Sequence, residues 1–136
     1  MALNILVVDD SAIVRAVIRK TLGLAGVDVG QIFEAENGQQ GLDVLKNQWV
    51  DLIFADINMP VMTGVEMIDR MNAHNLLKTV PVVVVSTDGS ATRVEELKAK
   101  GVREFVRKPF TPEIIRKVVA DILGGEHVGR SANHPA

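Results

Sequence analysis

Leu52-Ile53-Phe54-Ala55-Asp56 is an unbroken apolar run of four residues that ends in a carboxylate. Strands of a parallel sheet are buried on both faces, so their sequences are continuously apolar instead of alternating. Ile5–Val8 and Val82–Val85 have the same character. Gln31–Glu34 and Glu104–Arg107 carry more polar side chains, which suits edge positions. The five runs therefore predict a parallel sheet with three central strands.

Five segments with helical spacing alternate with these runs. Their apolar positions are, in chain order, Val14, Val17, Ile18 and Leu22; Leu42 and Leu45; Val65, Ile68 and Met71; Val94 and Leu97; and Ile114, Ile115, Val118, Val119 and Ile122. In Ala91–Lys100 this stripe is thin. Asn37 and Gln40 have the spacing of a capping box, and Pro112 follows Thr111 as the first residue of a helix often does. Five alternating β and α elements indicate one three-layer α/β domain with right-handed crossovers.

The composition narrows the possible function classes. The formal net charge of −2 gives no basic field that would hold nucleic acid. The absence of cysteine excludes a disulfide framework, cysteine-bound zinc and thiol catalysis. The apolar segment Ala2–Val8 lacks basic residues and runs directly into acidic ones, so it indicates a strand and not a secretion signal. No apolar run approaches the ~20 residues that span a bilayer. We therefore expect a cytoplasmic protein without membrane insertion.

Polar side chains stand just past four of the predicted strands. Asp9 and Asp10 follow the first, Asp56 the third, Ser86 the fourth and Lys108 the fifth. The carboxyl ends of parallel strands lie at one edge of the sheet, where such folds bind ligands, so we expect these side chains to converge. Three carboxylates would have raised pKa values unless a cation lay among them. Hard oxygen ligands with room for water and phosphate oxygens suit Mg²⁺.

A metal beside an exposed aspartate favours attack by that carboxylate on phosphorus, which would make Asp56 a nucleophile. Lys108 would supply a positive charge for the phosphoryl oxygens and Ser86 a hydroxyl donor. Each residue alone has a plainer explanation; Asp10-Ser11, for instance, suits the start of a helix. The conjunction at four strand ends favours a site that accepts a phosphoryl group.

These residues resemble the receiver family of two-component response regulators, and the closest likeness is to CheY-like single-domain regulators. The motifs that carry it are Asp9-Asp10, Asp56 within Phe54–Pro60, Gly64, Ser86 and Lys108-Pro109-Phe110. The likeness covers roughly residues 4–123. It implies a doubly wound five-stranded parallel sheet of order 2-1-3-4-5 with five helices, a flavodoxin-like or CheY-like fold. We expect a receiver domain over residues 1–124 and a flexible tail over 125–136.

The resemblance also implies a role for each residue of the site. Asp56 would be the phosphoacceptor. Asp10, Asp56 and the main-chain carbonyl of Asn58 would bind Mg²⁺ directly, and Asp9 would bind it through water. Lys108 would contact the phosphoryl group, and its bond to the following proline would be cis, a state found in about 5–6% of X–Pro bonds.

Four residues would govern the switch and its lifetime. By resemblance, Ser86 would move toward the phosphoryl group, and Phe105 would be the coupled aromatic that changes rotamer. Ser86 stands where threonine is also common, and Phe105 where tyrosine is common, so the aromatic lacks a hydroxyl group here. Phe105 equally suits an ordinary edge-strand position. Asn58 and Asp88 flank the acceptor and would influence how fast the aspartyl-phosphate hydrolyses.

The expected partners follow from the same resemblance. The phosphodonor would be a sensor histidine kinase. A downstream target protein would bind the face formed by the fourth helix, fifth strand and fifth helix, in a chemotaxis-type pathway. We expect a monomer that contacts no nucleic acid directly and catalyses at most its own phosphorylation and dephosphorylation.

Four alternatives stay open at this point. A haloacid-dehalogenase-type phosphohydrolase also forms an aspartyl-phosphate, but such enzymes place a second aspartate where this chain has Asn58. A flavodoxin-like cofactor binder would need a phosphate cradle where this chain has Asp9-Asp10-Ser11, which is hostile to an anion without metal. The chain also fits a phosphorelay intermediate or a receiver cut from a longer regulator with an output domain.

Overall fold

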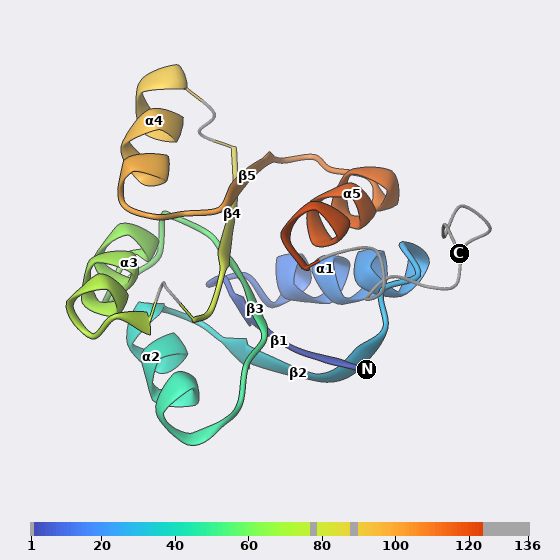
Figure 1. The fold of residues 1–136 in the computed structure, drawn as a ribbon, viewed down its shortest axis with the longest axis horizontal. Helices are drawn as coiled ribbons and strands as arrows, with labels where there is room; N and C mark the ends of the chain where they lie inside the picture. Colours follow the sequence, from blue (N-terminus) through green and yellow to red (C-terminus); the bar gives the residue numbers. More distant parts are fainter. Residues whose placement is uncertain (1, 77–78, 88–89, 124–136) are drawn as a thin grey trace.

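Five strands and five helices alternate along the residues that the computed structural model describes, which are 2–76, 79–87 and 90–123 (Figure 1). The elements are β1 (Leu3–Val8), α1 (Ala12–Leu24), β2 (Val29–Ala35), α2 (Gly38–Asn47), β3 (Leu52–Ala55), α3 (Gly64–Ala73), β4 (Val82–Ser86), α4 (Ala91–Ala99), β5 (Glu104–Arg107) and α5 (Pro112–Leu123). The predicted tail over 125–136 and the predicted lifetime residue Asp88 lie outside the described residues.

The strands form one parallel sheet of order β2-β1-β3-β4-β5, which confirms the predicted fold. Every residue of β3 and β4 is buried, as the continuous apolar runs predict. In register, Val8 at the end of β1 lies between Ala35 of β2 and Ala55 of β3. The residues that follow β1 and β3 therefore leave the sheet side by side.

β2 begins two residues earlier and ends one later than predicted, because pairing with β1 extends it. Val29 pairs with Leu3, and the register then shifts before Ile32 pairs with Ile5. The side chain of Asn4 accepts a hydrogen bond from the main-chain N–H of Gln31 at 3.1 Å within this irregular part. Tertiary pairing of this kind leaves no local apolar pattern in the sequence.

Helices cover both faces of the sheet (Figure 1). On one face, Ile18 and Leu22 of α1 pack with Ile115 and Val119 of α5. On the other, α2, α3 and α4 contribute a second core, whose helical members include Leu42, Met67, Ile68, Met71 and Leu97. Leu97 is the only buried side chain of α4, in agreement with its thin predicted stripe. In the part of the chain described here, no helix combines the length and the apolar character needed to cross a membrane.

The predicted apolar stripe of α1 is wrong at one position. Val17 is 49% exposed, whereas Arg15 is buried. The buried residues of the helix are Arg15, Ile18, Thr21 and Leu22. The side chain of Arg15 belongs to this face because it turns inward toward the end of β1. Ile13 in the first turn is also strongly exposed. Apolar side chains of α1, among them Ile13 and Val17, are therefore left on the surface.

Candidate functional site

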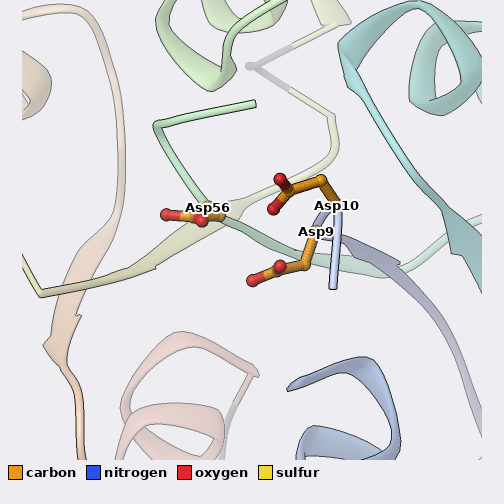
Figure 2. A group of neighbouring side chains, drawn as sticks. All are labelled: Asp9, Asp10 and Asp56. Atoms are coloured by element: carbon orange, nitrogen blue, oxygen red, sulfur yellow. The ribbon is translucent and has the colours of Figure 1, made fainter. Parts of the chain in front are cut away.

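Three carboxylates meet at the carboxyl edge of the sheet, as the strand-end argument predicts. Asp9 and Asp10 follow β1, Asp56 follows β3, and one oxygen of each lies within 4.8 Å of the others (Figure 2). Asp9 is buried, Asp10 is exposed and Asp56 is intermediate. This oxygen-only donor set, open to solvent on the side of Asp10, fits the coordination preference of Mg²⁺.

Hydrogen bonds fix both the main chain and the carboxylate of Asp9. Its main-chain N–H donates to the carbonyl of Ala35 in β2 at 3.0 Å. Its Oδ1 accepts the N–H of Ser11 at 2.9 Å, and its Oδ2 accepts a hydrogen bond from Lys108 Nζ at 3.2 Å. With both carboxylate oxygens engaged, Asp9 is suited to the predicted contact through water. The Asp10 carboxylate is exposed and, within the described residues, makes no such hydrogen bond.

The Asp56 carboxylate is attracted by one neighbouring charge, Lys108, and repelled by another, Asp9. Its main-chain N–H donates to the carbonyl of Val8 at 2.9 Å, and its Oδ1 accepts the N–H of Ile57 at 2.7 Å. Lys108 Nζ lies 3.7 Å from Oδ2. Burial raises the pKa of Asp56 above its usual value, and the charge of Asp9 adds to this, although Lys108 and the N–H of Ile57 act in the opposite direction. Burial and the charge of Asp9 thus disfavour the ionised Asp56 carboxylate, and a bound cation would offset both effects.

This raised pKa predicts a pH-dependent stability. Since folded Asp56 holds its proton more tightly than the unfolded residue, its ionisation destabilises the fold as pH rises from the usual carboxyl pKa through the raised one. Asp56→Asn is therefore expected to increase the free energy of unfolding at pH 7 in metal-free buffer. The gain should disappear below the usual pKa of aspartate. Urea unfolding at several pH values measures it, and a gain that is constant with pH would contradict the electrostatic origin.

Lys108 reaches the acids from the β5–α5 connection. The Lys108–Pro109 bond is cis, which confirms the prediction. The main-chain N–H of Lys108 donates to the carbonyl of Ser86 at 2.9 Å, so the ends of β4 and β5 are joined at this edge. Ser86 is buried at the end of β4. Lys108, Asp9 and Asp56 are thus brought into contact, with Ser86 anchored to the same segment.

Two other predicted residues lie around this centre. Asn58 follows Asp56 by two residues and is exposed. Phe105 on β5 is partly buried and packs against the core on the side of α2, α3 and α4. Its intermediate burial fits either of the two interpretations given above, an edge-strand side chain or a rotamer switch.

The loop from β3 to α3 is tied down next to Asp56. The N–H of Gly64 donates to the carbonyl of Ile57 at 2.8 Å, which ties the start of α3 to the residue after Asp56. Val61 has a φ of 67° and is closed into a turn by the N–H of Met62, which donates to the carbonyl of Pro60 at 2.7 Å. A β-branched residue in this region is strained by about 1–3 kcal/mol and persists only where its surroundings enforce it.

Sequence reasoning missed Arg15. Its guanidinium donates to the main-chain carbonyl of Asp9 and, through Nε, to Glu34 Oε1 at 2.8 Å. A signal was present, because Arg15 lies three residues before Ile18 and seven before Leu22, which is the spacing of one helix face. A charged residue on a core face indicates a buried polar partner.

The fold and the site together define a small α/β protein with an acidic, lysine-containing centre at the carboxyl edge of its sheet. The family model described as response regulator receiver domain matches residues 5–120, and the chain belongs to this family.

Several relatives are similar over nearly the whole chain. A chemotaxis protein CheY homolog of Campylobacter jejuni is 36% identical over 90% of this chain and 93% of its own length. Chemotaxis protein CheY1 of Helicobacter pylori is 32% identical over 90% of this chain and 98% of its own. Among solved structures, the chemotaxis response regulator CheY4 of Vibrio cholerae matches with a TM-score of 0.79 and 31% identity, over 90% of this chain and 100% of that one.

Proposed function

We propose that this receiver is a signalling switch in which Asp56 accepts a phosphoryl group from a histidine kinase with the help of Mg²⁺. The observation that carries the proposal is the meeting of Asp9, Asp10, Asp56 and Lys108 at one edge of the sheet. Family membership supports phosphorylation-dependent signalling as the general role. The protein would catalyse only its own phosphorylation and dephosphorylation, and it would act in the cytoplasm.

Each residue of the site would have its own role in phosphoryl transfer. Asp10, Asp56 and the main-chain carbonyl of Asn58 would hold Mg²⁺, with Asp9 contacting it through water; the ion would offset the charge of the carboxylates and the phosphoryl oxygens. A carboxylate oxygen of Asp56 attacks phosphorus as the P–N bond of the donor phosphohistidine breaks, and the imidazole keeps the electron pair. Lys108 contacts the transferred phosphoryl oxygens, and Ser86 donates its hydroxyl to one of them.

A small phosphodonor tests this chemistry without a partner. Incubation with acetyl phosphate and Mg²⁺ is expected to increase the mass of the intact protein by one phosphoryl group. The added group should be removed by hydroxylamine, as an acyl phosphate is, and EDTA should prevent its addition. A phosphoryl group that is stable to hydroxylamine, or that is added equally well in EDTA, would contradict the proposed function.

Exposed apolar side chains support a protein as the natural donor. Ile13 is 77% exposed in the first turn of α1, Val17 follows it on the same helix, and Val61 is 82% exposed in the loop after Asp56. Val17 also lines a hollow with Lys108 and Pro109. Apolar surface beside a charged reaction centre is typical of a protein-binding surface. A histidine-containing domain that docks here would present its phosphohistidine to Asp56.

Ile13→Glu is expected to reduce phosphoryl transfer from a kinase that phosphorylates the parent protein by about tenfold, the loss typical of one interfacial side chain. Phosphorylation by acetyl phosphate should not change, because this donor needs no docking surface. Leu24→Glu is the matched control, since Leu24 is an exposed apolar residue of the same helix, about 17 Å further along it. Equal loss in the two variants would exclude a local docking surface.

The output face is proposed to be that of α4, β5 and α5. α4 buries only Leu97, so it is weakly anchored and suited to move when charge is added at the end of β4. Its cations Arg93 and Lys98 are half-exposed and exposed, respectively. The chemotaxis names of the relatives support a target in chemotaxis-type signalling. Charge reversal at Arg93 and Lys98 should weaken phosphorylation-dependent target binding, and unchanged affinity would exclude the face.

A further inference from the structure

Arg15 carries the only basic side chain that is buried within the described residues, with 9% of the residue exposed. A guanidinium is costly to remove from water unless its donors are satisfied by charged or carbonyl partners. Arg15 lies on α1, in the first two turns of the helix that follows Asp9 and Asp10. Its burial therefore needs an explanation beyond the packing of α1.

The partners of Arg15 come from two strands. Nη1 donates to the main-chain carbonyl of Asp9, just past the end of β1. Nε donates to Glu34 Oε1 in β2 at 2.8 Å. The other oxygen of Glu34 contacts Arg19, one turn further along α1 and half exposed. Glu34 thus neutralises and orients Arg15, and Arg15 in turn links β2, α1 and the residue after β1.

The contacted carbonyl has a special place in the site. β1 ends at Val8, so the carbonyl of Asp9 lies beyond the strand's own ladder. It belongs to the peptide group that joins Asp9 to Asp10, and rotation of this group changes the direction of the Asp10 side chain. The N–H of Asp9 is fixed by Ala35 and its carbonyl by Arg15. The exposed carboxylate of Asp10 is thereby directed to the region that it shares with Asp56 (Figure 2).

We propose that Arg15 is a positioning residue for cation binding: by fixing the peptide group between Asp9 and Asp10, it holds the Asp10 carboxylate where it completes a Mg²⁺ site. The inference rests on the proposed function in so far as Mg²⁺ binds at this cluster. Outer partners that orient metal ligands typically change metal affinity by about 10–100-fold when removed. The same size of effect is expected here.

Electrostatics and positioning predict opposite results for the loss of this arginine. A positive charge repels Mg²⁺, so removal of the charge alone would strengthen binding of the cation. Loss of the hydrogen bond to the Asp9 carbonyl would weaken it, because the Asp10 carboxylate would no longer be held. The direction of the change therefore separates the two effects.

The experiment measures Mg²⁺ affinity by calorimetric titration of the parent protein, Arg15→Met, Arg15→Lys, Glu34→Gln and Arg19→Met. Arg15→Met should raise the Kd by about 10–100-fold, and Arg15→Lys by less, since one ammonium cannot reproduce the fork that joins Asp9 and Glu34. Arg19→Met is the matched control: it removes a cation paired with the same glutamate but without contact to Asp9, and it should change the Kd less than about twofold. Urea unfolding in metal-free buffer establishes that each variant is folded during the titration.

If Arg15→Met does not fold, Glu34→Gln takes its place. This variant keeps the guanidinium of Arg15 but removes the charge that orients it, and the same increase in the Kd for Mg²⁺ is expected.

A second measurement distinguishes positioning from general loosening. With acetyl phosphate as donor, Arg15→Met should need more Mg²⁺ for half-maximal phosphorylation and reach the parent's maximal rate at saturation. Unchanged or tighter Mg²⁺ binding by Arg15→Met, or an equal loss in Arg19→Met, would overturn the positioning role and leave the proposed function intact. Failure of the parent protein itself to bind Mg²⁺ would overturn both.

Discussion

Asp56→Asn is expected to accept no detectable phosphoryl group, from acetyl phosphate or from a kinase, at any Mg²⁺ concentration. A carboxamide is not a nucleophile toward phosphorus, and the substitution also removes one of the three carboxylates that meet at the sheet edge. Intact-protein mass measurement over a series of Mg²⁺ concentrations tests this. Folding is not the cause of the loss, because the same substitution is expected to stabilise the metal-free protein at neutral pH.

Asp10→Asn is the matched comparison for this prediction. It removes a carboxylate from the same cluster but keeps the acceptor, so its phosphorylation should be slow at low Mg²⁺ and should recover as Mg²⁺ is raised. The two aspartates are thereby separated into an acceptor and a ligand. Phosphorylation of the Asp56→Asn protein at the parent's rate would locate the acceptor at another residue. The buried hydroxyl of Ser86 is a poor candidate, since it is 1% exposed.

The sheet and the acidic cluster could be predicted from the sequence because both depend on short-range patterns. β3 was predicted over Leu52–Ala55 and is found there, since a strand buried on both faces is apolar at every position. Parallel strand direction brings Asp9, Asp10 and Asp56 to one edge of the sheet, and the strand order implied by the resemblance places β1 beside β3. These features need no knowledge of which helix packs on which strand.

The features that could not be predicted depend on contacts between distant segments. Val17 has an apolar side chain at helical spacing, but whether it is buried depends on how far α5 covers α1. The spacing of Arg15 with Ile18 and Leu22 indicates the core face of the helix, but its partners, the carbonyl beyond β1 and Glu34 of β2, are known only from the fold. The positive φ of Val61 likewise arises from how the loop is tied down and not from its residue type.

Gly64 is another residue whose role depends on contacts between segments. The sequence does not show how closely the start of α3 approaches the end of β3 at this residue. A Cβ at Gly64 would lie 2.1 Å from the main-chain oxygen of Asp56 and 2.9 Å from the Cα of Ile57. Both are backbone atoms, which cannot rotate away. The N–H of Gly64 also donates to the carbonyl of Ile57 at 2.8 Å, so a shift that relieves the clash would lengthen this bond.

Gly64→Ala is therefore expected to lower the free energy of unfolding by about 2–4 kcal/mol, the sum of overpacking and a weakened buried hydrogen bond. It should also slow phosphorylation by acetyl phosphate, because the displaced atoms belong to Asp56 and its neighbour. Gly23→Ala is the control: apart from its chain neighbours and the backbone of α1 itself, no atom lies within 4 Å of the added Cβ. Because the residue is inside α1, this variant should be more stable by about 0.5–1 kcal/mol with unchanged phosphorylation. Urea unfolding and the rate of mass increase measure the two effects. If Gly64→Ala kept the parent's stability, α3 would have to move away from β3 without loss of stability. The tight attachment of the β3–α3 loop inferred from Gly64 and Ile57 would then be wrong.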